Sequence, residues 1–191
     1  MNFSVGRDNE FAEAVEAGDQ KKVARMVKDA VKAAMPNTKA VDRWGKPRLL
    51  YHGTPQENQF YEFNGTIYLS SNRSVANEYT HYLRTFGANP RQTGRIMPVF
   101  VNLENPLEID ANRHLWRNID VEWSDTPVTT RDIEQYAKDN GYDGVIIRRV
   151  RDNMYDNDTT AADVYIAFSP EQVKSAGPTY EQKRRSHFPL G

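Results

Sequence analysis

The spacing of apolar residues predicts two helices at the start of the chain. Through residues 20–35, apolar side chains recur at three- and four-residue intervals, at Val23, Met26, Val27, Ala30, Val31 and Ala34. Asp19 is a suitable N-cap for this helix, and Pro36 ends it. A shorter helix is expected over residues 9–17, with Gly18 at its C-terminal end. Residues 1–40 are therefore interpreted as an N-terminal helical lead that packs against a sheet face.

Short apolar runs bounded by polar or turn-forming residues predict the strands that follow. These runs cover residues 49–51, 66–69, 95–103, 145–150 and 163–168. Helices are expected after Ser71, and from Thr129 or Thr130 to Asn140. Strands interleaved with a few helices indicate an α+β fold, in which two small antiparallel sheets pack around a cleft. This domain is expected to cover residues 41–176.

Two further segments are predicted to lack regular structure. Residues 80–94 contain Gly87, Pro90 and Gly94, and are interpreted as a loop that flanks the site in the position of a lid. Residues 177–191 combine prolines with charged side chains, so a poorly ordered tail is expected there.

Composition narrows the classes of protein to which the chain can belong. Its 191 residues suit one domain, and no apolar run approaches the roughly 18 residues that suggest a membrane span. The first residues lack the pattern of a signal peptide. The chain contains no Cys, which excludes disulfides, thiolate nucleophiles and Cys-ligated metals. With 25 basic and 26 acidic residues, the net charge of −1 gives no general attraction to nucleic acid or to an anionic membrane.

The polar groups best suited to a site lie between residues 48 and 79. One apolar run ends at residues 52–54 (His-Gly-Thr), a second ends at Ser70 and Ser71, and a helix follows. This order predicts strand, turn, strand and helix, with polar side chains where the strands end, which is where sites tend to be built. Metalloprotease, phosphate-loop and nucleophile-elbow motifs are absent from the sequence, so no metal is expected.

The stretch resembles the histidine–tyrosine class of ADP-ribosyltransferases, which includes diphtheria toxin and the poly(ADP-ribose) polymerases. In that class the first strand carries a His-Gly pair, here His52 and Gly53, and the second strand carries a tyrosine, here Tyr68. Another tyrosine follows eleven residues later on the next helix, as Tyr79 does here. The layout is most similar to the phage-type domains of polyvalent and injected proteins, over about residues 40–176. The resemblance implies their split β-sandwich of two small antiparallel sheets.

The resemblance also implies a substrate, NAD+, and a role for each residue of the motif. Tyr68 and Tyr79 would sandwich the nicotinamide, because a cationic ring between aromatic faces gains about 1–2 kcal/mol per face. His52 would hydrogen-bond a ribose hydroxyl, and the main chain of Gly53 would read the carboxamide. Thr54 and Ser70 would add hydroxyl contacts or only shape the turns. The structural alternatives are a satisfied histidine, a turn glycine and two core tyrosines.

The catalytic carboxylate of the class has no direct counterpart here. Many members carry Glu at the start of the last strand, where it stabilises positive charge on the ribose. Aligning residues 165–168 with that strand puts Val164 at the Glu position and Asp163 one residue earlier. Asp163 is a catalytic candidate if the strand shifts by one residue. Otherwise the chain resembles mono-ADP-ribosylating members with an aliphatic residue there, and both alternatives disfavour growth of poly(ADP-ribose).

The resemblance predicts an NAD+-dependent mono-ADP-ribosyltransferase that cleaves the nicotinamide–ribose bond and transfers ADP-ribose to a macromolecule. A protein acceptor is favoured over nucleic acid, with no membrane partner, in the cytoplasm of a bacterial or phage-infected cell where the protein would act as an effector. The alternatives are a catalytically degenerate module that binds NAD+ or a partner, a small nuclease-like toxin domain, and an RNA 2′-phosphotransferase. The NAD+ phosphates need a donor, for which the sequence offers four unranked candidates: Arg73, Arg84, Arg91 and Arg95.

Overall fold

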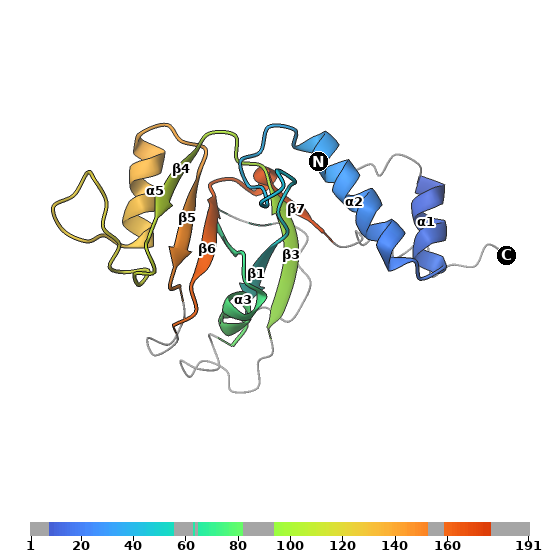
Figure 1. Ribbon diagram of the computed structural model, residues 1–191, viewed down its shortest axis with the longest axis horizontal. Coiled ribbons are helices and arrows are strands. Elements are labelled where there is room, and N and C mark those ends of the chain that lie inside the picture. Colours follow the sequence, from blue (N-terminus) through green and yellow to red (C-terminus); the bar gives the residue numbers. More distant parts are fainter. Residues whose placement is uncertain (1–7, 56–62, 64, 82–93, 153–158, 177–191) are drawn as a thin grey trace.

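A single seven-stranded mixed sheet runs through the protein in the order β4-β5-β6-β2-β1-β3-β7 (Figure 1). The computed structural model describes residues 8–55, 63, 65–81, 94–152 and 159–176. The strands are β1 (Leu50–Thr54), β2 (Ile67–Ser70), β3 (Arg95–Val101), β4 (Pro106–Asp110), β5 (Gly144–Val150), β6 (Ala162–Ala167) and β7 (Val173–Ser175). The helices are α1 (Asp8–Glu16), α2 (Gln20–Ala34), α3 (Arg73–Tyr79) and α5 (Thr130–Asp139), with the 3-10 turn η1 (Pro170–Gln172). The predicted tail and most of the predicted lid lie outside the described residues.

The expectation of two separate antiparallel sheets is corrected by the strand pairing. β4 and β5 are parallel, and the other neighbours are antiparallel. The two halves of the sheet meet between β1 and β2 through a single register pair, Tyr51 with Ser70. By contrast, β1 pairs with β3 along its whole length, from Leu50–Val99 to Thr54–Arg95. One sheet therefore has a narrow join at its centre, and we call the region between β1 and β2 the seam.

The His-Gly-Thr triplet lies inside β1 and not after its end. The sequence suggested a strand over residues 49–51, whereas β1 begins at Leu50 and continues to Thr54. The reason is pairing, because β3 offers a long partner whose register carries the strand through Gly53 to Thr54. The alternation of strand side chains therefore decides which face of the sheet each residue of the triplet occupies.

Two hydrophobic cores cover the two faces of the sheet. The first, called the Tyr165 face, includes Leu50, Leu69, Val99 and Tyr165. The second, called the α5 face, includes Ile133, Ala137, Val145, Ile147, Val164 and Ile166. Adjacent residues of β6, Val164 and Tyr165, belong to different cores, as strand alternation requires. Tyr68 packs against the α5 face.

Helices α2 and α5 begin at capping residues that the local sequence supplies. Asp19 accepts a hydrogen bond from the Lys22 amide at 3.0 Å and caps α2, while Thr129 and Asp132 form a capping box at the start of α5. Only the last turns of α2 reach the sheet, where Val31 packs against Phe100 of β3. In Figure 1, α1 and the first turns of α2 extend beyond β7, so little of this segment covers a sheet face.

Candidate active site

Tyr68 and helix α3 lie on the same face of the sheet, at the seam. Tyr51 and Ser70 are directly opposed across the seam, so their side chains share a face. Because strand side chains alternate, Gly53 and Tyr68 occupy that face too. Helix α3 packs there against β1, and a Cβ added to Gly53 would lie 1.7 Å from the carbonyl oxygen of Ala76. The second tyrosine of the motif is therefore brought to the face that carries the first.

A glycine is required at position 53 because helix α3 packs directly against it, a contact that the sequence did not reveal. We expected the glycine to let a ligand approach the main chain, yet the space beside its Cα is filled by the α3 backbone. The Cβ of Tyr79 would also lie only 3.1 Å from an added Cβ. Any larger residue would push α3 off the strand and separate Tyr79 from Tyr68. The main-chain N–H and C=O of Gly53 remain candidates to read an amide.

The hydroxyl of Tyr68 is anchored by a carboxylate from helix α5. It donates a hydrogen bond to Oε2 of Glu134, a side chain that is only 13% exposed. The other oxygen of Glu134 accepts hydrogen bonds from Thr66 Oγ1 at 2.8 Å and from the ammonium of Lys138. Three donors thus hold the carboxylate, and through it the ring of Tyr68 is fixed relative to α5.

These contacts decide the protonation states around Tyr68. Burial alone would raise the pKa of Glu134, but hydrogen bonds from Lys138, Tyr68 and Thr66 hold the pKa below its usual value. Burial and the Glu134 carboxylate together raise the pKa of Tyr68 far above that of a free phenol. Glu134 is therefore ionised and Tyr68 is a neutral donor at physiological pH.

Tyr79 reaches a second acid, at the end of β5. Its hydroxyl donates to the main-chain carbonyl oxygen of Asp152 at 3.3 Å. Burial raises the pKa of the Asp152 carboxyl to about 7, and this effect outweighs the hydrogen bond with Tyr79, which lowers the pKa, while the charge of Glu78 raises it by the least. The pKa of Tyr79 is raised as well, first by burial and then by Asp152. Asp152 also raises the pKa of Tyr68, and Tyr68 raises the pKa of Tyr79, so the three groups lie close enough to interact electrostatically.

His52 also lies at the seam, but strand alternation directs its side chain to the Tyr165 face, opposite to Tyr68. Its register partner is Met97, and its ring contacts Phe63 edge-on, with a centroid separation of 5.2 Å. Nδ1 of His52 lies 3.0 Å from the main-chain carbonyl oxygen of Tyr68. A carbonyl only accepts, so Nδ1 carries the proton and Nε2 is the acceptor nitrogen. Burial lowers the pKa of His52, which keeps this neutral form through physiological pH.

The remaining predicted binding residues support the strands around this site. Ser70 is buried, and its hydroxyl accepts from the Asn72 amide at 3.1 Å, which shapes the turn into α3. Thr54 is buried at the end of β1. Of the four candidate phosphate donors, Arg73 begins α3 and Arg95 begins β3, both exposed, whereas Arg84 and Arg91 lie outside the described residues.

One family comparison agrees with the pair of tyrosines and the histidine at the seam. Residues 42–180 match the family described as ADP-ribosyltransferase in polyvalent proteins. The chain belongs to this family. The match covers more than half of the sequence and confirms the resemblance drawn from the His-Gly, Tyr68 and Tyr79 motif. No curated protein matches the chain.

Membership makes the protein a transferase by family, with NAD+ as the substrate that such domains use. Among the described residues, no three His, Asp or Glu side chains gather closely enough to hold a metal ion. No helix in the described ranges is long and apolar enough to cross a membrane.

Asp163 does not join the tyrosines in this ADP-ribosyltransferase domain. It lies two residues before Tyr165, so its side chain belongs to the Tyr165 face, whereas Tyr68 packs on the α5 face. Its Oδ2 accepts from Arg48 at 2.7 Å, and its Oδ1 accepts from the Arg149 amide at 3.0 Å. This geometry gives no support to the hypothesis that Asp163 replaces the family carboxylate. The position on the α5 face is occupied by Val164, which is 1% exposed.

Sequence inspection missed both acids that the tyrosines contact. Glu134 and Lys138 are four residues apart on a predicted helix, a spacing that normally marks an exposed ion pair. Asp152 follows a strand with no motif around it. What places Glu134 beside Tyr68 is the packing of α5 over the strand that carries Tyr68, and such tertiary contacts are not visible in the sequence.

Proposed function

We propose that the domain is an NAD+-dependent mono-ADP-ribosyltransferase that transfers ADP-ribose to a macromolecular acceptor. The observation that carries the proposal is the placement of Tyr68 and Tyr79 on one face at the seam, next to a neutral His52. Two protonated phenol rings suit a cationic pyridinium, which gains stacking and cation–π energy between them. The Nε2 of His52 suits a hydroxyl donor such as that of a ribose.

The reaction needs no redox partner. The bond between C1′ of the ribose and the pyridinium nitrogen breaks, and both electrons go to nicotinamide, which leaves as a neutral molecule. A lone pair of the acceptor then forms the new bond to C1′, and the acceptor loses its proton to solvent. Positive charge builds on the ribose in between, as in glycoside hydrolysis. The site therefore has to stabilise a positive charge that moves from the nicotinamide ring to the ribose.

Transfer of a single ADP-ribose is favoured over chain growth because Val164 occupies the position where polymer-forming enzymes of the class carry an acid. A protein acceptor is favoured over nucleic acid because the net charge is −1. The cytoplasmic location and the effector role remain predictions from the sequence resemblance.

The proposal is tested with labelled NAD+ and a bacterial lysate, following nicotinamide release and label transfer together. Tyr68→Ala and His52→Ala should each lower kcat/KM at least about 30-fold, the equivalent of about 2 kcal/mol of transition-state stabilisation. Tyr136→Ala is a matched control measured per folded molecule, since Tyr136 packs against the same core as Tyr68 but its ring stacks on Trp123, with the ring centroids 4.0 Å apart. Unchanged turnover in both variants would refute the assigned roles.

A second function has one observation in its favour. Neither Val164 nor the ion-paired Asp163 offers a carboxylate to the ribose, which suits a degenerate module that binds NAD+ without cleaving it. Tight NAD+ binding by the wild-type protein with no nicotinamide release would select this alternative. Release of nicotinamide at a rate that His52→Ala abolishes would exclude it.

A further inference from the structure

Among the described acids that contact Tyr68 or Tyr79, Asp152 is the one that forms no ion pair with Lys or Arg. Glu134 is paired with Lys138, and Asp163 is paired with Arg48. Within the part of the chain that the structure describes, no Lys or Arg forms an ion pair with Asp152. Instead the charged neighbour that acts on it is another acid, Glu78 of α3. An ionised carboxyl in this setting has no positive partner from the described part of the chain.

The main chain around Asp152 is held from both sides. The amide of Arg151 donates to the carbonyl oxygen of His114 at 2.9 Å, and the Arg151 carbonyl accepts from the Trp116 amide at 3.0 Å. On the other side, the Tyr79 hydroxyl donates to the Asp152 carbonyl oxygen. Asp152 is thus fixed between the segment that follows β4 and the helix that carries the second tyrosine.

A bulge in β5 directs the chain to this position. The register of β5 against β6 shifts between Ile147 and Val150, and Arg149 adopts a left-handed conformation with φ of 52°. The Arg149 amide donates to Asp163, and its guanidinium binds both oxygens of Asp110. Bulges bend a strand and re-aim the residues beyond them. Here the bend precedes the turn of the chain that brings Asp152 to Tyr79.

We propose that Asp152 is the carboxylate that faces the positive charge of the bound pyridinium and of the ribose as nicotinamide leaves. This inference rests on the proposed function, because the cation it invokes is NAD+. Asp152 forms no covalent bond: the C1′–N bond breaks with its electrons on nicotinamide, and the carboxylate acts only through its charge. The cation would supply the positive partner that no Lys or Arg within the described ranges provides. Asp152 therefore takes the part for which the sequence had suggested Asp163.

The electrostatics around Asp152 give the proposal a pH signature. The groups that act on it are Glu78 and Tyr79 from α3, and it interacts in turn with Tyr68 of β2, which Arg131 of α5 also influences. With its pKa near 7, Asp152 is only partly ionised at neutral pH in the free protein. Binding of a cation favours the ionised form, so NAD+ binding should release a proton between about pH 6 and 7.

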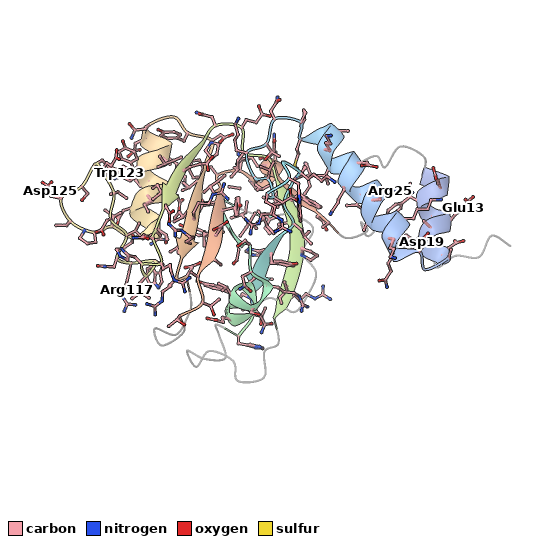
Figure 2. The ribbon with its side chains drawn as sticks, in the orientation of Figure 1. Glu13, Asp19, Arg25, Arg117, Trp123 and Asp125 are labelled. Atoms are coloured by element: carbon pink, nitrogen blue, oxygen red, sulfur yellow. The ribbon has the colours of Figure 1, made fainter. Side chains whose placement is uncertain are left out.

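The experiment compares wild type with Asp152→Asn, Asp152→Glu and the matched control Asp125→Asn. Asp125 lies exposed on the loop before α5, far from the seam (Figure 2). Wild-type kcat/KM for nicotinamide release should rise through about pH 7, and Asp152→Asn should lower it about 10- to 100-fold at pH 8. In Asp152→Asn, the loss of activity at acid pH should begin only below pH 6.5, because it then reflects protonation of His52, whose pKa is lowered from that value. Asp152→Glu should restore part of the rate, and Asp125→Asn should behave as wild type.

A second variant tests the same charge without altering Asp152. Glu78→Gln removes the weaker of the two effects that raise the pKa of Asp152, the stronger being burial, so the midpoint of the pH profile should move down by a small amount while the plateau stays the same. A midpoint near pH 7 that persists in Asp152→Asn would assign the acid limb to another group and overturn the proposal. Calorimetry of NAD+ binding in buffers of different ionisation enthalpy measures the released proton directly, and Asp152→Asn should abolish that release.

The outcomes separate this inference from the proposed function. If wild type releases nicotinamide and Asp152→Asn keeps its rate within about threefold, the role of Asp152 is overturned and the transferase stands. If wild type binds NAD+ without turnover, but with proton release that Asp152→Asn abolishes, the charge partner stands and the transfer activity fails. If wild type does not bind NAD+, both fail.

Discussion

Two clusters of tyrosine and acid side chains lie on opposite faces of the sheet, and they differ in how the negative charge of the acid is balanced. On the Tyr165 face, the hydroxyl of buried Tyr165 accepts from Arg148 at 2.8 Å, and Asp163 accepts from Arg48. On the α5 face, Tyr68 donates to Glu134, and Tyr79 donates to the main chain of Asp152. The first cluster is closed by two arginines. The second contains Asp152, with which no Lys or Arg of the described residues forms an ion pair.

This difference shows that residue type and sequence position do not reveal which acid the fold brings to the tyrosines. Asp163 stands one residue from the family position, yet strand alternation sends it to the wrong face, where arginines satisfy it. Asp152 is remote from any motif, yet the fold delivers it to Tyr79. A carboxylate already balanced by guanidinium groups stabilises the fold, whereas one without a cation is available to a cationic ligand.

The largest expected effect breaks the closed cluster. Asp163→Asn removes the charge that faces Arg48 and Arg148, whose side chains are 32% and 29% exposed. We expect the free energy of unfolding to fall by about 2–3 kcal/mol, toward the low end for a broken buried pair because the arginines are partly solvated. Urea denaturation measures this. Turnover per folded molecule should stay within about threefold of wild type, and a loss of turnover with unchanged stability would return Asp163 to the catalytic set.

The next effect concerns the open cluster and depends on pH. The pKa of Asp152 is about 7 in the folded protein, and about 3.9 in an unfolded chain. Between these values the folded state binds more protons, so this group lowers stability as pH rises from about 4 to 7. Asp152→Asn should therefore gain stability relative to wild type across that window, by about 2 kcal/mol at pH 8, less than the full difference in pKa would give because the residue is only half-buried. Thermal or urea unfolding at pH 5 and pH 8 checks it, and a pH-independent difference would contradict it.

A smaller effect is expected from the anchor of Tyr68. Glu134→Gln keeps the shape of the side chain but removes the charge that binds Lys138 and Thr66. The unfolding free energy should fall by about 1 kcal/mol, and the KM for NAD+ should rise several-fold more than kcat falls, because the Tyr68 ring loses its fixed position. Glu122→Gln, on the exposed loop before α5, is the matched control. If kcat falls and KM does not change, Glu134 acts on the reacting atoms and not through Tyr68.

The smallest effect probes the bulge that links the two clusters. Arg149 has a positive φ, which costs an L residue about 1 kcal/mol relative to Gly. Both Arg149→Gly and Arg149→Ala remove the exposed pair with Asp110, so the comparison isolates the backbone. Arg149→Gly should be about 1 kcal/mol more stable than Arg149→Ala in urea denaturation. Equal stabilities would show that the bulge is relaxed and imposes no conformation on the chain before Asp152.

Much of the framework was predictable because it depends on local pattern. The helix after Asp19, the helix capped by Thr129 and the strand around Val164 formed where periodicity placed them. The family was predictable because the His-Gly pair and the eleven-residue interval between Tyr68 and Tyr79 lie close together in the chain. These features need only neighbours in sequence.

What the sequence did not reveal depends on contacts between distant segments. Nothing local shows that β1 and β2 meet at a single pair, or that the two halves form one sheet. The role of Gly53 in seating α3 required the position of Ala76. The acids at Tyr68 and Tyr79 come from residues 134 and 152, far along the chain. Site chemistry of this kind follows from the packing of helices and strands rather than from motif spacing.

The central claim is that Tyr68 and Tyr79 form a slot for a nicotinamide ring on the α5 face of the seam. A crystal structure of the protein soaked with nicotinamide tests it directly, because the leaving group binds without turnover. The account predicts the pyridine ring between the two phenol rings, with its carboxamide on the main chain of Gly53. A ring bound on the Tyr165 face, near Asp163 and its arginines, would contradict the account.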